Sequence, residues 1–78
     1  RPAPDGAVHG DGQVLSARQR EVAALIAQGL TNREIAKSLV ITEGTVATHV
    51  MHILNKLGLT SRVQIATWAV REGLSAGA

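Results

Sequence analysis

Recurring helix-start and helix-stop signals divide most of this chain into four short helical segments. Three segments open with a Ser or Thr followed three residues later by Gln or Glu, the capping-box spacing in which each side chain bonds the other residue's backbone N–H. Glycines that are each followed by a leucine supply the left-handed conformation in which helices often end. The boxes pair Ser16 with Gln19, Thr31 with Glu34 and Ser61 with Gln64, and the glycines are Gly29, Gly58 and Gly73. With Thr42 as a further cap, we expect helices over about 17–28, 32–39 and 43–57, and from 62 to a stop near Gly73.

Apolar residues recur at helical spacing in each segment, which gives each one a face for a shared core. Trp68 is the only aromatic residue and β-branched runs are short, so helices are favoured over a sheet. We expect an all-α fold with Ile41 buried between the second and third helices. The predicted core residues are Val22, Leu25, Ile26, Ile35, Ala36, Leu39, Val46, Val50, Ile53, Leu54, Leu57, Ile65, Ala66, Ala69 and Val70.

The 78 residues suffice for one small domain, which we place at residues 15–74. Residues 1–14 contain both prolines and are expected to be a flexible linker or tail, and residues 75–78 a frayed C-terminal tail. There is no cysteine, which excludes disulfides and thiolate metal sites. The longest apolar run, residues 22–27, is too short to span a bilayer, so no membrane association is expected. Because the chain begins with Arg1, we expect a piece of a longer protein whose N-terminal regulatory domain is absent.

The third segment has an unusual outer face. Opposite its apolar stripe lie small or weakly polar residues where Lys, Glu and Arg are typical: Gly44, Thr48, Met51, His52 and Asn55. A short helix closely followed by such a helix is typical of a helix-turn-helix, whose second helix enters the DNA major groove. Small residues permit close approach, Thr can bond base edges, and Met can pack on a thymine methyl. The pattern alone also fits an ordinary small helical bundle.

Many positions at fixed spacing also carry a resemblance. They are Leu15-Ser16-x-Arg18-x-x-Glu21-Val22, Gly29-Leu30-Thr31-Asn32-Arg33-Glu34-Ile35-Ala36, Leu39, Thr45-Val46, His49, Val50, Ile53, Lys56-Leu57 and Ser61-Arg62. In these residues the chain resembles the LuxR-type helix-turn-helix domain. The resemblance implies a four-helix output domain of a bacterial transcription regulator that binds double-stranded DNA sequence-specifically. It also implies a recognition helix at about 43–57 and a homodimer formed through the last helix. The expected location is cytoplasmic, associated with the nucleoid, and no cofactor is expected.

The same resemblance assigns roles to individual residues. Expected base contacts are Ala47, Thr48 and Met51, with Gly44 close to the DNA. Expected phosphate contacts are Thr31, Asn32, Arg33, Thr45, His49, Asn55, Lys56 and Arg62, and expected dimer contacts are Trp68, Ala69 and Leu74. Some alternatives stay open. Arg33 and Lys56 could instead be solvated surface cations. Arg62 could form an ion pair with Glu21, and Trp68 could cover the edge of the core.

Several residues depart from the pattern of similar domains. Ala47 stands where Lys is usual, Met51 where a polar or basic group is frequent, Gln19 where Glu is usual and Ala23 where Leu is usual. Because the third helix then carries one acid and one base, we expect weak DNA binding that depends on dimerisation or a neighbouring domain. A domain serving mainly in dimerisation or protein docking is the alternative.

Two further classes of function are not expected from the sequence. His49 and His52 are three apart on a helix, but no Cys or nearby acid completes a metal site. No nucleophile, base and orienting group come together in the sequence, so we do not expect an enzyme.

Overall fold

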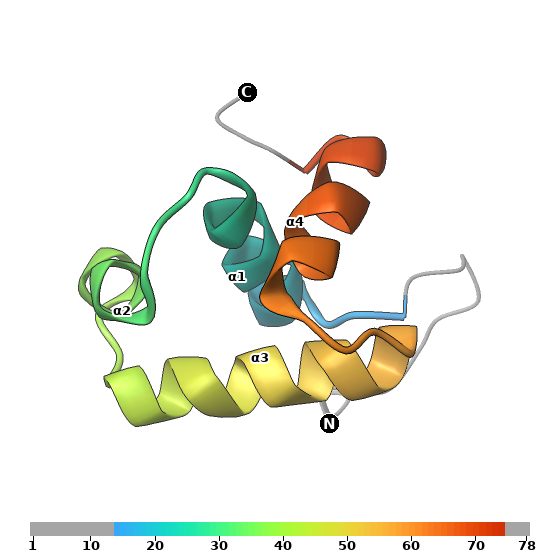
Figure 1. The fold of residues 1–78 in the computed structure, drawn as a ribbon. Coiled ribbons are helices and arrows are strands. Elements are labelled where there is room, and N and C mark those ends of the chain that lie inside the picture. The colour runs from blue at the N-terminus through green and yellow to red at the C-terminus, as the bar shows by residue number, and fades with distance from the viewer. Residues whose placement is uncertain (1–13, 75–78) are drawn as a thin grey trace.

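The computed structural model describes residues 14–74, and these form four α-helices (Figure 1). The helices are α1 (Ala17–Ala27), α2 (Asn32–Leu39), α3 (Glu43–Leu57) and α4 (Arg62–Arg71). The predicted four-helix, all-α fold is therefore confirmed, with each boundary within a residue or two of its expected place. The predicted tails fall outside the described residues, apart from Val14. No helix within residues 14–74 is both long enough and apolar enough to cross a bilayer.

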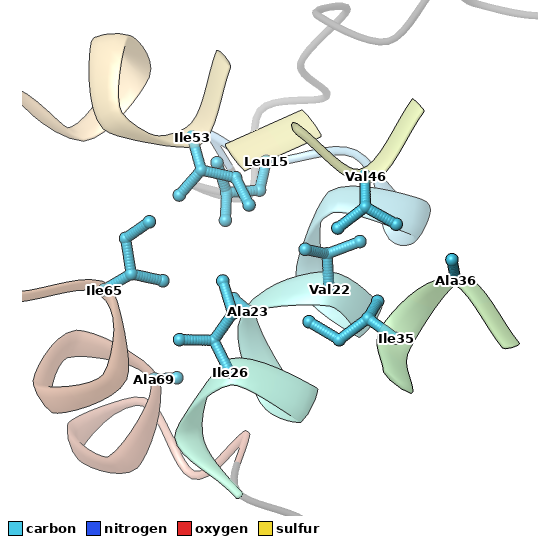
Figure 2. Close-up of a cluster of buried hydrophobic side chains, with 10 residues drawn as sticks. All are labelled: Leu15, Val22, Ala23, Ile26, Ile35, Ala36, Val46, Ile53, Ile65 and Ala69. Atoms are coloured by element: carbon cyan, nitrogen blue, oxygen red, sulfur yellow. The ribbon is translucent and has the colours of Figure 1, made fainter. Parts of the chain in front are cut away.

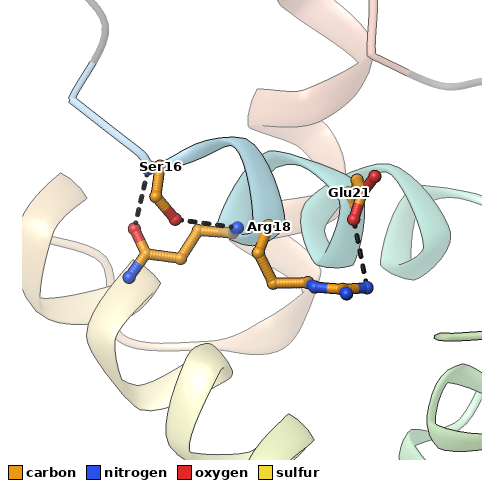
Figure 3. Close-up of polar contacts among 4 residues, drawn as sticks. Ser16, Arg18 and Glu21 are labelled. Carbon is orange, nitrogen blue, oxygen red and sulfur yellow. Dashed lines mark hydrogen bonds and ion pairs between the residues drawn. The ribbon is translucent and has the colours of Figure 1, made fainter. Parts of the chain in front are cut away.

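The helices begin where the capping pattern predicts, at Ser16, Thr31, Thr42 and Ser61. At α1 the Ser16 hydroxyl accepts from Gln19 N at 3.1 Å, and Ser16 N donates to Gln19 Oε1 at 3.1 Å (Figure 3). The boxes of α2 and α4 close in the same reciprocal way. These bonds satisfy backbone donors that have no partner within the helix.

All four helices also end in one kind of turn. A left-handed residue follows the helix, and the next N–H donates to a carbonyl five residues back. Three of the four left-handed residues are the predicted glycines, Gly29, Gly58 and Gly73. The closing bonds there are Leu30 N to Leu25 O at 3.2 Å, Leu59 N to Leu54 O at 2.9 Å, and Leu74 N to Ala69 O at 2.8 Å.

The exception is Val40, the left-handed residue that ends α2. Its φ and ψ are 60° and 50°, and Ile41 N donates to Ala36 O at 3.0 Å, so the turn closes as at the glycines. A β-branched side chain is disfavoured in this conformation. Since Val40 is 87% exposed, its side chain gains almost nothing from packing in return. Ile41, predicted to be buried, is half-buried and packs against the core.

The core lies between α1 and the three other helices (Figure 2). α1 packs most extensively against α4, and α2 packs mainly against α3. The buried hydrophobic residues are Leu15, Val22, Ala23, Ile26, Ile35, Ala36, Val46, Ile53, Ile65 and Ala69. One predicted core residue is wrong, because Val70 is 56% exposed near the end of α4. The long α3 runs along one side of the molecule, with the other three helices on its inner side (Figure 1).

Candidate nucleic-acid interface

The outer face of α3 is exposed at every position predicted to contact bases. Val46 and Ile53 are completely buried on its inner side, which fixes the rotation of the helix about its axis. That rotation exposes Gly44, Ala47, Thr48 and Met51, together with His52 and Asn55 further along. The only charged residues of α3 are Glu43 at its start and Lys56 near its end. The structure thus presents a helix surface that is exposed and almost uncharged.

Gly44 is not required by the fold. It lies in the first turn of α3 with no left-handed conformation, and a Cβ placed on it would meet only Thr42 Oγ1, at an ordinary 3.9 Å. Glycine within a helix costs about 0.5–1 kcal/mol relative to alanine. The missing side chain therefore leaves open surface on the outside of the helix, where a partner's backbone has room to approach closely.

Thr48 uses its hydroxyl proton inside the helix. Its Oγ1 donates to Gly44 O at 3.1 Å, the carbonyl one turn earlier. The hydroxyl oxygen keeps acceptor capacity toward solvent. In this rotamer Thr48 offers an acceptor to a partner rather than a donor.

The Thr45 hydroxyl, unlike that of Thr48, accepts a hydrogen bond within the protein. The Thr42 hydroxyl accepts from Thr45 N at 3.0 Å and donates to Thr45 Oγ1 at 2.9 Å. Because Thr45 Oγ1 already accepts a bond, its own proton can be donated outward. The helix N-terminus carries partial positive charge, so a hydroxyl donor here suits an anion.

The predicted phosphate contacts of α2 divide into an exposed pair and one half-buried residue. Thr31 and Arg33 are exposed at the helix start. Thr31 N donates to Glu34 Oε1 at 2.8 Å, so the carboxylate of the capping box occupies one of the amides that an anion would use. Asn32 is half-buried and its Oδ1 accepts from Arg62 Nη1 at 2.6 Å.

Arg62 joins α4 to the segment that leads into α2. Besides the bond to Asn32, its Nη2 donates to Leu30 O at 2.6 Å. The suggested ion pair of Arg62 with Glu21 does not form, because Glu21 pairs with Arg18 at 3.2 Å (Figure 3). The structure therefore gives Arg62 a positioning role that the sequence analysis missed. Only the tertiary fold brings these residues together.

Thr45, His49 and Lys56 follow one flank of α3, at spacings of four and seven residues. Lys56 Nζ donates to Gln19 Oε1 at 2.9 Å, a contact between α3 and the start of α1. The side chain of His49 is half-buried, and its Nδ1 has no hydrogen-bond partner. Among residues 14–74 no group of three or more His, Cys, Asp or Glu is placed to hold a metal ion.

The residues predicted for a dimer contact differ in exposure. Trp68 and Leu74 are half-buried and pack against the core, so each has a free side and an anchored side. Ala69 is 0% exposed, and its side chain has no accessible surface to offer a second chain. Two valines of α4 that the sequence analysis did not assign to this role, Val63 and Val70, are exposed.

The two helices α2 and α3, their short connection and the exposed face of α3 define a helix-turn-helix domain. Residues 13–69 match the family model described as bacterial regulatory proteins, luxR family. The chain belongs to this family. The assignment agrees with the predicted resemblance and supports a role in bacterial transcription regulation rather than catalysis.

Individual proteins similar to this chain are named as regulators. The nitrate/nitrite response regulator protein NarL of Escherichia coli is 52% identical over 58 residues, which cover 74% of this chain and 27% of NarL. The transcriptional regulatory protein LnrK of Bacillus subtilis is 49% identical over 61 residues, 78% of this chain and 28% of LnrK. This chain thus spans less than a third of the length of either relative.

A solved structure shows the same arrangement of helices. The response regulator ChrA, from a heme-sensing two-component system, superposes with a TM-score of 0.71 at 45% sequence identity. The match covers 80% of this chain and 31% of the ChrA chain.

Proposed function

We propose that this domain binds double-stranded DNA sequence-specifically as the output domain of a bacterial transcription regulator, with α3 in the major groove. The observation that carries the proposal is the exposed, almost uncharged face of α3. Its small side chains fit a groove that admits a helix, and its rotation is fixed by a buried inner side. The setting is the cytoplasm, at the nucleoid, where such a regulator meets its DNA.

Base reading is assigned to Ala47, Thr48 and Met51, with Gly44 against the DNA. Because Thr48 presents an acceptor, its fitting partners are the amino groups that adenine and cytosine display in the major groove. Met51 and the methyl of Ala47 suit apolar contact with a thymine methyl. We expect the preferred sites to reflect these two kinds of contact.

Phosphate anchoring is assigned to the two flanks of this face. Thr45, His49, Asn55 and Lys56 lie on α3, and Thr31 and Arg33 lie at the exposed start of α2. Asn32 and Arg62 support this surface mainly by fixing the start of α2. Since α3 contributes a single basic side chain, few counterions are released on binding and the affinity of one domain is low.

Dimerisation through α4 would offset this low affinity. Trp68 and Leu74 are assigned to the contact, and Val63 and Val70 are further exposed apolar residues of α4. Two linked domains on a two-part site bind with an effective local concentration that a single domain lacks. A dimer on a pseudo-palindromic site is therefore the expected binding form.

A selection from a randomised duplex library, followed by a salt titration on the selected sequence, tests the proposal. We expect enrichment of one sequence family, and an affinity that falls with a shallow slope as salt increases. Sedimentation of the protein with and without duplex measures the fraction of the protein that is dimeric.

A second candidate function follows from the missing charge on α3. The fold could serve mainly as a dimerisation or protein-docking module with weak DNA affinity. The selection separates the two functions. Absence of any enriched sequence at low salt, even when the protein concentration is doubled, would favour the docking module and refute DNA binding by this domain.

A further inference from the structure

α2 carries two basic side chains on one exposed flank. Arg33 and Lys37 are both exposed, and their spacing of four residues places them about 40° apart around the helix axis. Ile35 and Ala36 are buried on the other side of α2, which fixes the rotation of the helix about its axis. The sequence analysis assigned a role to Arg33 and none to Lys37.

The two cations are not balanced by an acid. Within residues 14–74 neither Arg33 nor Lys37 forms an ion pair. Glu34 is the only acid of α2, and its Oε1 accepts from Thr31 N at 2.8 Å in the capping box. Like charges four residues apart slightly destabilise a helix. The stability of the folded domain therefore does not account for two cations on this flank.

The helix dipole accounts for a cation in this turn but not for its place beside Arg33. Lys37 lies in the last turn of α2, where the partial negative charge of the helix end favours a basic side chain. Ser38 is also exposed in this turn, so a lysine there would gain as much from the dipole. A lysine at position 38 would also follow Glu34 by four residues, the favourable spacing for an ion pair.

The proposed DNA interface lies next to α2 and has little positive charge of its own. α2 packs mainly against α3, the helix proposed to enter the major groove. α3 carries one acid and one base. The Arg62 guanidinium donates to Leu30 O and to Asn32 Oδ1 within the protein. If Arg33 meets a phosphate as proposed, Lys37 is on the same side of α2, toward the DNA backbone.

We propose that Lys37 is a further DNA phosphate contact and that it acts together with Arg33 along one flank of α2. The Lys37 ammonium has three N–H donors and a full charge, so it can bind phosphate oxygens and release a counterion from the DNA. The inference rests on the proposed DNA binding, and it assigns to α2 the electrostatic anchoring that α3 lacks.

The test is a cycle of four proteins, each 78 residues long and titrated with salt on the selected duplex. They are the parent, Lys37→Ser, Ser38→Lys, and the exchange variant that carries both substitutions. The exchange variant keeps the composition, the net charge and a lysine in the last turn, and it moves the ammonium about 100° around α2. It is therefore the matched control for net charge and for the helix dipole.

The slope of log K against log salt should depend on position 37 alone. Lys37→Ser and the exchange variant should each lower the steepness by about 0.9 for each bound domain, while Ser38→Lys should keep the parent's slope. Between about 50 and 200 mM salt, the parent should then lose about 3.5-fold more affinity per bound domain than Lys37→Ser does. At low salt Lys37→Ser should bind every duplex more weakly by a similar factor, because a phosphate contact reads no base.

Three results would overturn the inference. They are an unchanged slope in Lys37→Ser, an exchange variant with the parent's slope, and a Ser38→Lys variant whose slope is steeper by about 0.9. The last two would show that net charge acts without regard to its place on α2. Ser38→Lys keeps Lys37, so it decides the question even if Lys37→Ser unfolds at a lower temperature than the parent. A parent that binds no duplex refutes the proposed function and the inference together, whereas a parent that binds while all four slopes agree refutes the inference alone.

Discussion

Replacing Val40 by glycine should stabilise the domain. Val40 holds φ at 60°, and the left-handed conformation costs a residue with a Cβ roughly 1–2 kcal/mol. Glycine removes that cost. It also gives the unfolded chain more conformational freedom, which lowers the free energy of unfolding by about 0.4–1 kcal/mol. Because the valine is 87% exposed, little packing is lost. The expected net gain is about 1 kcal/mol, a rise in Tm of roughly 4–8 °C for a domain of this size.

Thermal and urea unfolding followed by circular dichroism measure this gain. Val63→Gly is the matched control, since Val63 is also an exposed valine but has a helical backbone in α4. There glycine should destabilise the domain, because it relieves no strain and only adds freedom to the unfolded chain. Val40→Asn should also stabilise, since asparagine tolerates the left-handed region. A Val40→Gly variant no more stable than the parent would show that the turn holds no strain, and the reasoning would be wrong.

Three other substitutions test the interface. Gly44→Ala should raise stability by about 0.5–1 kcal/mol and weaken binding to every duplex, and unchanged binding would mean that DNA does not approach this residue. Thr48→Ala should relax the preference at one base pair, by about 1–3 kcal/mol in a competition assay, while a loss that is equal for all sequences would remove Thr48 from base reading. Arg62→Met should lower the free energy of unfolding by about 2 kcal/mol, since it removes two hydrogen bonds to a charged group, and leave the salt slope unchanged. A shallower dependence of log K on log salt in this variant would indicate that Arg62 contacts a DNA phosphate.

The helix starts could be predicted from sequence because their bonds are local. Ser16 and Gln19, or Thr31 and Glu34, are three residues apart, so residue type and spacing define the contact. The exposed face of α3 was predictable for a similar reason, because helical periodicity places its apolar residues on one side. Three of the four helix ends were marked by glycine.

The interactions that adjust the candidate site could not be predicted in this way. Lys56 and Gln19 are 37 residues apart, and Arg62 is 30 residues from Asn32. No local pattern records such pairings, which depend on how α1 and α4 pack. The left-handed Val40 was missed because the turn is imposed by closing α2 against α3 rather than by a residue that prefers it. Val70 was misplaced because it lies about 100° around α4 from its fully buried neighbour Ala69, outside the buried side of a helix that continues to Arg71.

The bonds of Arg62 couple two parts of the surface that would otherwise be independent. Its guanidinium donates to Leu30 O and to Asn32 Oδ1, so the helix proposed for dimerisation is hydrogen-bonded directly to the start of α2. In a dimer built through α4, the separation of the two α3 helices would then be fixed by the protein. Such a dimer would tolerate few changes in the number of base pairs between half-sites, and it would distinguish operators by their spacing as well as by their bases.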